Sequence, residues 1–282
     1  MKTVNSISGG KTSAYLSKFY PADINIFSLV RIEDRECLWM SGKDEPTRQL
    51  ISDRIDKEFI GTAEMDEIIY TILDLEQFIG SEIKIITGET FEQIILNRGG
   101  YLPNKMVRFC TSEMKVIPIF NYLRSLNCLP VEMRIGYRPN EITRIETMKS
   151  KAGANGIEKF KTVVGEMGTR NKWGEVDYRM ARFPLWEDNV TKDVIYNYWN
   201  DKPVRFAYRN NCVMCVNRQP LMISHMATKE RRKVEWAKKI EEKTGNQFLS
   251  VASMSRILNY SVQVNLFNDD DFSDCDSGFC GI

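Results

Sequence analysis

Short apolar or alternating segments recur through the first half of the chain, and stretches with helical spacing separate them. Runs of four to eight apolar and β-branched residues bounded by turn residues are typical of strands. Four such runs lie at residues 3–7, 24–30, 83–87 and 131–135. Because strands that alternate with helices form parallel sheets with helices on both faces, the pattern predicts an α/β fold.

The helical stretches complete the expected organisation. They lie at residues 46–59, 65–79, 90–97 and 111–123, from residue 191 onward and over residues 216–244. We expect a twisted, mainly parallel five-stranded sheet in a first domain of residues 1–205, and a helical, cysteine-bearing region in residues 206–282. Residues 150–172 are rich in Gly and Lys without clear periodicity, so we expect a long loop or lid there.

A glycine pair follows the first predicted strand and opens the first predicted helix, in the segment Ser8-Gly9-Gly10-Lys11-Thr12-Ser13. Adjacent glycines permit positive φ angles and leave no Cβ to obstruct a ligand. Unpaired amides at a helix N-terminus favour an anion, and the hydroxyls and the Lys11 ammonium would add donors. The segment predicts a phosphate site, although its spacing is not that of a Walker A loop and a simple turn would show the same pattern.

Composition narrows the class of protein. The 282 residues are 43% hydrophobic and 27% charged, with a net charge of +1, as in an ordinary globular protein. This net charge gives no overall electrostatic reason to expect nucleic acid or an anionic membrane as partner. No apolar run approaches the ~20 residues that a membrane span needs, and no signal-peptide pattern opens the chain. We therefore expect a cytoplasmic protein without a membrane partner.

Seven cysteines and a single histidine, His225, limit the metal chemistry. Cys212 and Cys215 form a CxxC pair, a spacing with which two thiolates can bind one metal ion or cluster. Further ligands must come from Cys37, Cys110, Cys128, Cys275, Cys280 or His225. One histidine excludes a multi-histidine metal site and argues against a serine–histidine triad. Thiols that bind no metal are the alternative interpretation.

Several motifs occur in an order that resembles the phosphoadenosine phosphosulfate reductase family of the PP-loop superfamily. The matching segments, which cover roughly residues 4–220, are Ser8-Gly9-Gly10-Lys11-Thr12-Ser13, Arg108-Phe109-Cys110-Thr111 with Lys115, Ile135-Gly136-Tyr137-Arg138 with Glu141 and Arg144, Phe183-Pro184-Leu185-Trp186 with Asp193 and Val194, and Cys212 with Cys215. The resemblance implies a sheet of the adenine nucleotide alpha hydrolase type that binds ATP or a sulfonucleotide.

The resemblance also implies roles for individual residues. Ser8, Gly9, Gly10 and Ser13 would cradle the nucleotide phosphates. Arg138 and Arg144 would face the phosphate or sulfate end of the ligand, a role that suits the planar, two-pronged guanidinium. For either arginine, a surface ion pair is the alternative.

The chain departs from the family pattern at its cysteines. Iron–sulfur members carry a cysteine pair before the CxxC, whereas Cys110 here stands beside Thr111. Reductases of the family carry their nucleophilic cysteine in a tail that ends Glu-Cys-Gly-Leu/Ile-His, whereas this chain ends Phe279-Cys280-Gly281-Ile282 and lacks the glutamate and the histidine.

Three interpretations follow. In the first, Cys280 attacks the sulfur of a bound sulfonucleotide and a thiol reductant completes the reaction. In the second, which we favour, Cys275 or Cys280 completes a zinc or iron–sulfur site with Cys110, Cys212 and Cys215. The chain then cleaves ATP between the α and β phosphates with Mg²⁺ and adenylates an acceptor. In the third, the chain binds a nucleotide without turnover.

The long C-terminal helical pattern bears on a nucleic-acid acceptor. It places six cations between positions 229 and 239, and glutamates at 230, 235, 241 and 242 interrupt them. Mixed charges of this kind are typical of a solvated helix face. A nucleic-acid acceptor is therefore the weaker expectation.

Overall fold

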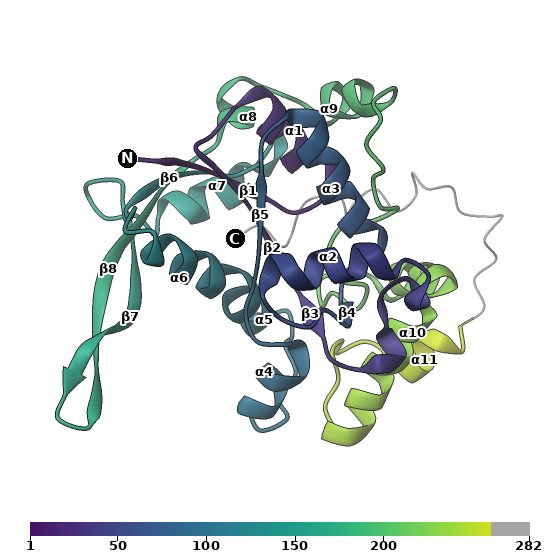
Figure 1. Cartoon of the computed structure of the whole chain (residues 1–282). Coiled ribbons are helices and arrows are strands. Elements are labelled where there is room, and N and C mark those ends of the chain that lie inside the picture. The colour runs from purple at the N-terminus through teal and green to yellow at the C-terminus, as the bar shows by residue number, and fades with distance from the viewer. Residues whose placement is uncertain (261–282) are drawn as a thin grey trace.

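A computed structural model describes residues 1–260, so the expected roles of Cys275 and Cys280 lie outside the described residues. A six-stranded central sheet organises this part of the chain (Figure 1). In order across the sheet, its strands are β5 (Ile83–Thr87), β2 (Ile24–Leu29), β1 (Thr3–Ile7), β6 (Val131–Arg134), β8 (Arg170–Arg182) and β7 (Glu158–Met167). All neighbours are parallel except β7 and β8. The predicted α/β class and mainly parallel sheet are confirmed, with six strands instead of five.

Successive strand residues face opposite sides of the sheet, and each side has its own core. Ile26 belongs to the cluster that includes α6 (Ile117–Ser125) and α7 (Ile142–Lys149). The next residue, Phe27, belongs to the larger cluster with α1 (Lys11–Phe19) and α3 (Glu67–Ile79). A strand buried on both faces explains why the second predicted strand reads as a continuous apolar run.

The remaining predicted helices form close to their expected bounds. Two of them have side-chain caps: Asp44 accepts a bond from the Thr47 amide at the start of α2 (Glu45–Ile55), and Thr90 caps α4 (Phe91–Asn97) in a capping box with Gln93. The other elements are β3 (Arg31–Ile32), β4 (Gly61–Thr62), the short helices η1 (Arg35–Cys37), η2 (Trp39–Gly42), α5 (Phe109–Thr111), η3 (Ser112–Val116), η4 (Pro139–Glu141) and α8 (Pro184–Glu187), and the helices α9 (Lys192–Trp199), α10 (Pro220–Thr244) and α11 (Met254–Leu258).

The expectation of a loop or lid at residues 150–172 is wrong. Most of this segment is β7 and the start of β8, which form an antiparallel hairpin that projects from the body of the molecule (Figure 1). β8 also pairs in parallel with β6, so the hairpin extends the central sheet. Its outer part is solvated on both sides, and strands of that kind lack the apolar pattern by which buried strands are recognised.

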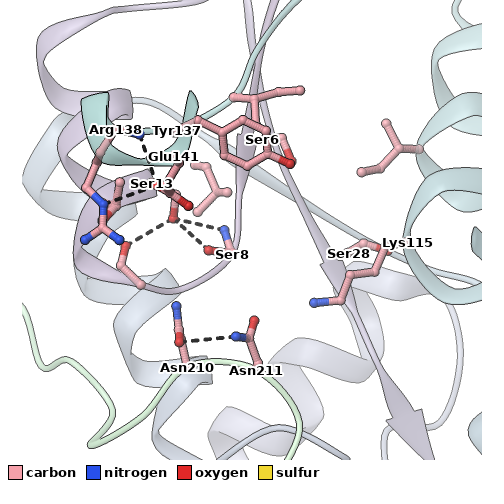
Figure 2. Close-up of a pocket in the computed structure, with 16 residues that line it drawn as sticks. Ser6, Ser8, Ser13, Ser28, Lys115, Tyr137, Arg138, Glu141, Asn210 and Asn211 are labelled. Carbon is pink, nitrogen blue, oxygen red and sulfur yellow. Dashed lines mark hydrogen bonds and ion pairs between the residues drawn. The ribbon is translucent and has the colours of Figure 1, made fainter. Parts of the chain in front are cut away.

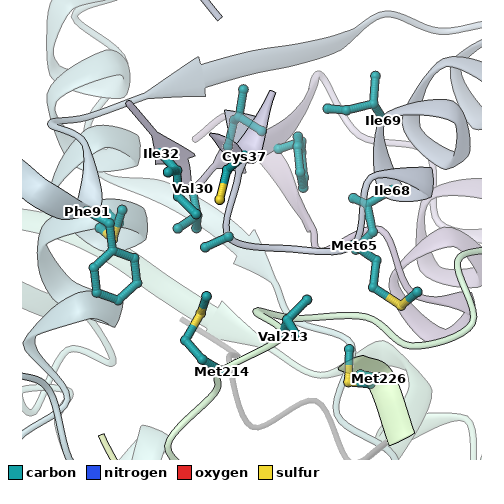
Figure 3. Close-up of a cluster of buried hydrophobic side chains, with 14 of the residues drawn as sticks. Val30, Ile32, Cys37, Met65, Ile68, Ile69, Phe91, Val213, Met214 and Met226 are labelled. Atoms are coloured by element: carbon teal, nitrogen blue, oxygen red, sulfur yellow. The ribbon is translucent and has the colours of Figure 1, made fainter. Parts of the chain in front are cut away.

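The C-terminal region packs against the N-terminal part of the chain through the CxxC turn. Val213 and Met214, the two residues between the cysteines, are buried in the larger core cluster beside Val30 and Met65 (Figure 3). The Val213 amide donates to the carbonyl of Ala63 at 2.8 Å. The division of the chain at residues 205 and 206 stays a prediction. None of the helices in residues 1–260 has both the length and the apolarity needed to cross a membrane.

Candidate functional site

A cavity opens where β1 and β6 end, at the carboxyl edge of the sheet. Residues from five separate segments of the chain line it, and Figure 2 shows their side chains. They include Ser8, Thr12, Ser13, Lys115, Arg138 and Asn210. In open α/β sheets, ligands bind outside the carboxyl ends of the strands. The cavity is therefore the candidate site, and it contains the phosphate-binding segment that the sequence predicts.

The surroundings of the loop demand glycine at position 9 and bring a side-chain amide close to position 10. Gly9 has a φ of +75°, and a Cβ there would lie 2.8 Å from Cγ2 of Ile68 in α3. A Cβ on Gly10 would lie 2.5 Å from Nδ2 of Asn210. Positive φ and close approach are the two conditions that only glycine meets without strain. The glycine pair therefore lets the loop pass between α3 and the segment around Asn210.

The loop serines hold the turn in shape. The Ser13 hydroxyl accepts a hydrogen bond from the Ser8 amide at 3.0 Å and donates to the Gly10 carbonyl at 3.1 Å. The two serine hydroxyls lie 3.1 Å apart. The loop geometry at the N-terminus of α1 is therefore built by its own side chains.

Lys11 and Lys115 occupy different places. The Lys11 ammonium lies 4.3 Å from the centre of the Tyr196 ring in α9, and Lys11 is not among the residues that line the cavity. Lys115 lines the cavity, and Figure 2 shows it approaching from the side opposite Ser8 and Arg138. The lysine of the cavity is thus Lys115. It belongs to the motif that begins at Arg108, and the glycine loop of residues 8–13 by itself does not predict it.

A buried carboxylate holds Lys115. Nζ of Lys115 lies 3.0 Å from Oε1 of Glu64, whose side chain is fully buried, and Oε2 of Glu64 has no hydrogen-bond partner. Lys115 itself lies in the π-helical turn η3, a feature often found at functional sites. Breaking a buried pair by removing one partner is costly, so each member fixes the other. The Glu64 contribution was not predicted, because it depends on packing between segments 51 residues apart.

Arg138 lies in the wall of the cavity and has a buried donor without a partner. Its side chain is 4% exposed, and Glu141 accepts bonds from its amide at 3.0 Å and from Nε at 3.2 Å. Nη1 of Arg138 is buried and has no hydrogen-bond partner. A buried donor without a partner costs about 1–3 kcal/mol. An anion in the cavity would satisfy it.

Arg144 lies next to this cavity and not in its wall. Nη1 of Arg144 donates to Oε1 of Glu141 at 2.5 Å, and its guanidinium lies 4.2 Å from the centre of the Tyr137 ring. Burial raises the pKa of Tyr137, so its phenol stays protonated near neutral pH. The two predicted arginines therefore share one carboxylate, but only Arg138 lines this cavity.

Asn210 and Asn211 complete the cavity from the C-terminal region (Figure 2). Asn211 has a φ of +67°, a conformation that asparagine tolerates better than most residues. Arg218 donates to the carbonyls of Asn210 and Cys212, which ties this segment to the CxxC turn. Neither residue is predicted from the sequence, although an Asn-Asn pair stands directly before the CxxC.

The predicted metal ligands are only partly described. Cys110, Cys212 and Cys215 are half-buried, and the Cys215 amide donates to the Cys212 carbonyl at 3.1 Å in a tight turn. Over residues 1–260, no group of three or more His, Cys, Asp or Glu side chains is arranged to hold a metal ion. Since the expected set includes Cys275 and Cys280, the zinc or iron–sulfur site stays a prediction. Burial raises the pKa of Cys37 to about 12, so this thiol stays protonated near neutral pH and is poorly suited to bind a metal.

Comparison of the chain with protein-family models, with curated proteins and with solved structures finds no match in any of the three. Function must therefore be argued from the residues of the cavity themselves.

Proposed function

We propose that this chain is an adenine-nucleotide enzyme of the PP-loop type, which binds ATP in the cavity and cleaves it between the α and β phosphates to adenylate an acceptor. The observation that carries the proposal is the buried, unpartnered Nη1 of Arg138 in the wall of the cavity that also holds the glycine loop. An arginine fork and the amides at a helix N-terminus are both suited to phosphate.

The charges of the cavity support an anionic ligand. Its lining contains two cations, Lys115 and Arg138, and one carboxylate, Glu141, both of whose oxygens already accept bonds from arginines. Because Glu141 is engaged in this way, Mg²⁺ would be held mainly by the phosphates, as is usual for this ion. The fit is thus to the charged phosphate end of a nucleotide.

The resemblance to the phosphoadenosine phosphosulfate reductase family leaves a second reaction open. A sulfonucleotide carries the same kind of anionic end, and its reduction would use Cys280 as nucleophile and an external thiol reductant. A chain that only binds the nucleotide is the third alternative.

An anaerobic product assay separates these alternatives. The purified chain is given ATP with Mg²⁺ in one reaction, and phosphoadenosine phosphosulfate with a thiol reductant in another. Pyrophosphate is expected from the first reaction, together with adenylated acceptor or with the AMP that is released when water or another nucleophile displaces it. Sulfite from the second reaction would instead establish the reductase. Tight ATP binding without either product, in the presence of candidate acceptors, would support the binding module.

Two variants link the product to the site. Arg138→Gln should abolish nucleotide binding, because it removes the buried donor of the cavity. Arg182→Gln removes the same charge from a half-exposed residue whose nearest carboxylate oxygen, on Glu132, is 3.9 Å away, and it should retain full activity. Equal activity of the two variants would contradict the assignment of the cavity.

A further inference from the structure

A second, larger cavity lies beside the first. It has a volume of about 520 Å³. It shares Tyr137 with the first cavity, the one that contains the glycine loop and that we call the phosphate cavity. Its charged lining consists of Arg108, Arg144, Lys151, Arg179 and Glu158. Hydroxyl groups of Thr111, Ser112, Thr143 and Thr147 surround these charges. Four cations and one carboxylate give the lining a net charge of +3, so the cavity attracts anions.

Arg179 makes this cavity a built site and not a chance group of surface cations. The residue is 1% exposed, on β8. Its Nε donates to Oε2 of Glu158 at 2.8 Å, and its Nη1 lies 3.2 Å from the thioether sulfur of Met133. A thioether is a weak acceptor. In the described part of the chain, Glu158 is the one carboxylate that pairs with this buried guanidinium, which retains donors for an oxyanion.

One carboxylate connects the two cavities. Oε2 of Glu141 accepts from Arg138, which lines the phosphate cavity, and Oε1 accepts from Arg144, which lines the second cavity. Tyr137 lines both cavities, and the Arg144 guanidinium lies over its ring. A ligand in either cavity would therefore act on an arginine whose position depends on the same carboxylate.

We propose that the second cavity binds the acidic group, a phosphate or a carboxylate, of a second substrate that meets the nucleotide across Tyr137. The description of the ligand as a second substrate rests on the proposed function. The anion site does not, because it is argued from Arg179 and the charges of the second cavity alone.

The test uses the whole chain saturated with α,β-methylene ATP, so that the phosphate cavity is filled. Inorganic phosphate and citrate serve as separate probes for the two kinds of acidic group, and calorimetry gives their dissociation constants. Lys151→Glu should weaken binding of the preferred probe at least tenfold, since it inverts a charge in the cavity lining. Lys159→Glu makes the same change at an exposed residue outside this lining and should bind the probe as the unchanged chain does.

Two results would overturn the proposal: neither probe binds, or both variants bind equally well. Failure of the proposed function has a different signature. In that case the ATP analogue does not bind, while a titration of the nucleotide-free chain still separates Lys151→Glu from Lys159→Glu.

Discussion

At the scale of single residues, the sequence predicts those whose role is set by their own chemistry. Gly9, Gly10 and Ser13 could be assigned to the loop because backbone freedom and a short hydroxyl are properties of the residue itself. Arg138 could be assigned through the motif that contains it. Glu64 could not, since its role depends on burial against Lys115, which no local pattern records.

Gly9 provides a test at this scale. Gly9→Ala should destabilise the fold by about 2–4 kcal/mol, because it combines an unfavourable positive φ with a contact of 2.8 Å to Ile68. It should also abolish nucleotide binding, since the loop must shift. Urea denaturation and equilibrium dialysis with ATP are the measurements.

Gly80→Ala is the matched control. Gly80 also has a positive φ, +67°, but nothing lies within 4 Å of an added Cβ. This variant should cost about 1 kcal/mol and retain nucleotide binding. Equal losses in the two variants would show that Ile68 imposes no constraint on the loop.

At the scale of elements, the apolar pattern predicts the buried strands and helices well and the hairpin poorly. The strand at residues 3–7 has the bounds of β1, because its pattern reflects burial in the sheet. β7 and β8 owe their pairing to each other and to β6, and much of the hairpin is exposed. Exposure removes the alternation on which the prediction of strands depends.

A buried charge network attaches α10 to the rest of the molecule, and the apolar pattern of the sequence does not predict it. Lys233 is fully buried, and its Nζ lies 2.7 Å from Oδ1 of Asp66 and 3.2 Å from Oε1 of Glu230. Lys233→Met should destabilise the protein by about 3–5 kcal/mol, because it removes the fully buried cation of this network and leaves Asp66 and Glu230 with only the partly exposed Arg232. Thermal and urea unfolding would measure the loss.

Lys238→Met, on the same helix, controls for charge and helix propensity. Lys238 is partly exposed and lies 3.6 Å from Glu242, so its removal should cost less than about 1 kcal/mol. A loss at Lys238 as large as that at Lys233 would contradict the role of the buried network.

Glu92 gives the contact between α4 and α10 a dependence on pH. It accepts a hydrogen bond from the Trp236 indole at 2.9 Å, and burial raises its pKa. Above the unfolded pKa of about 4.3 and up to the raised folded pKa, the folded chain binds more protons than the unfolded chain. The contribution of Glu92 to stability therefore falls as pH rises through this window.

Glu92→Gln removes this titration. The free energy of unfolding of the variant should fall less steeply with pH above about 4.3 than that of the unchanged chain. Urea unfolding over a series of pH values compares the two slopes. Identical slopes would show that Glu92 titrates alike in the folded and unfolded chains.

At the scale of the whole molecule, the candidate site is an assembly of segments that are far apart in the sequence. The glycine loop, Lys115, Arg138 and Asn210 meet because parallel strands bring their carboxyl ends to one edge and because the CxxC turn packs into the larger core. The motif order indicated the first three. Asn210 follows from the packing of the C-terminal region, which only the folded chain defines.

A ligand held by all four segments should stabilise the whole fold. At a concentration of α,β-methylene ATP about 100 times its dissociation constant, the free energy of unfolding should rise by about 2.7 kcal/mol, since the ligand binds only the folded chain. Hydrogen exchange should slow both in the loop at residues 8–13 and around Asn210. Arg138→Gln should lose both effects, whereas Arg182→Gln should keep them. Protection confined to the loop would mean that the C-terminal region does not contribute to the site.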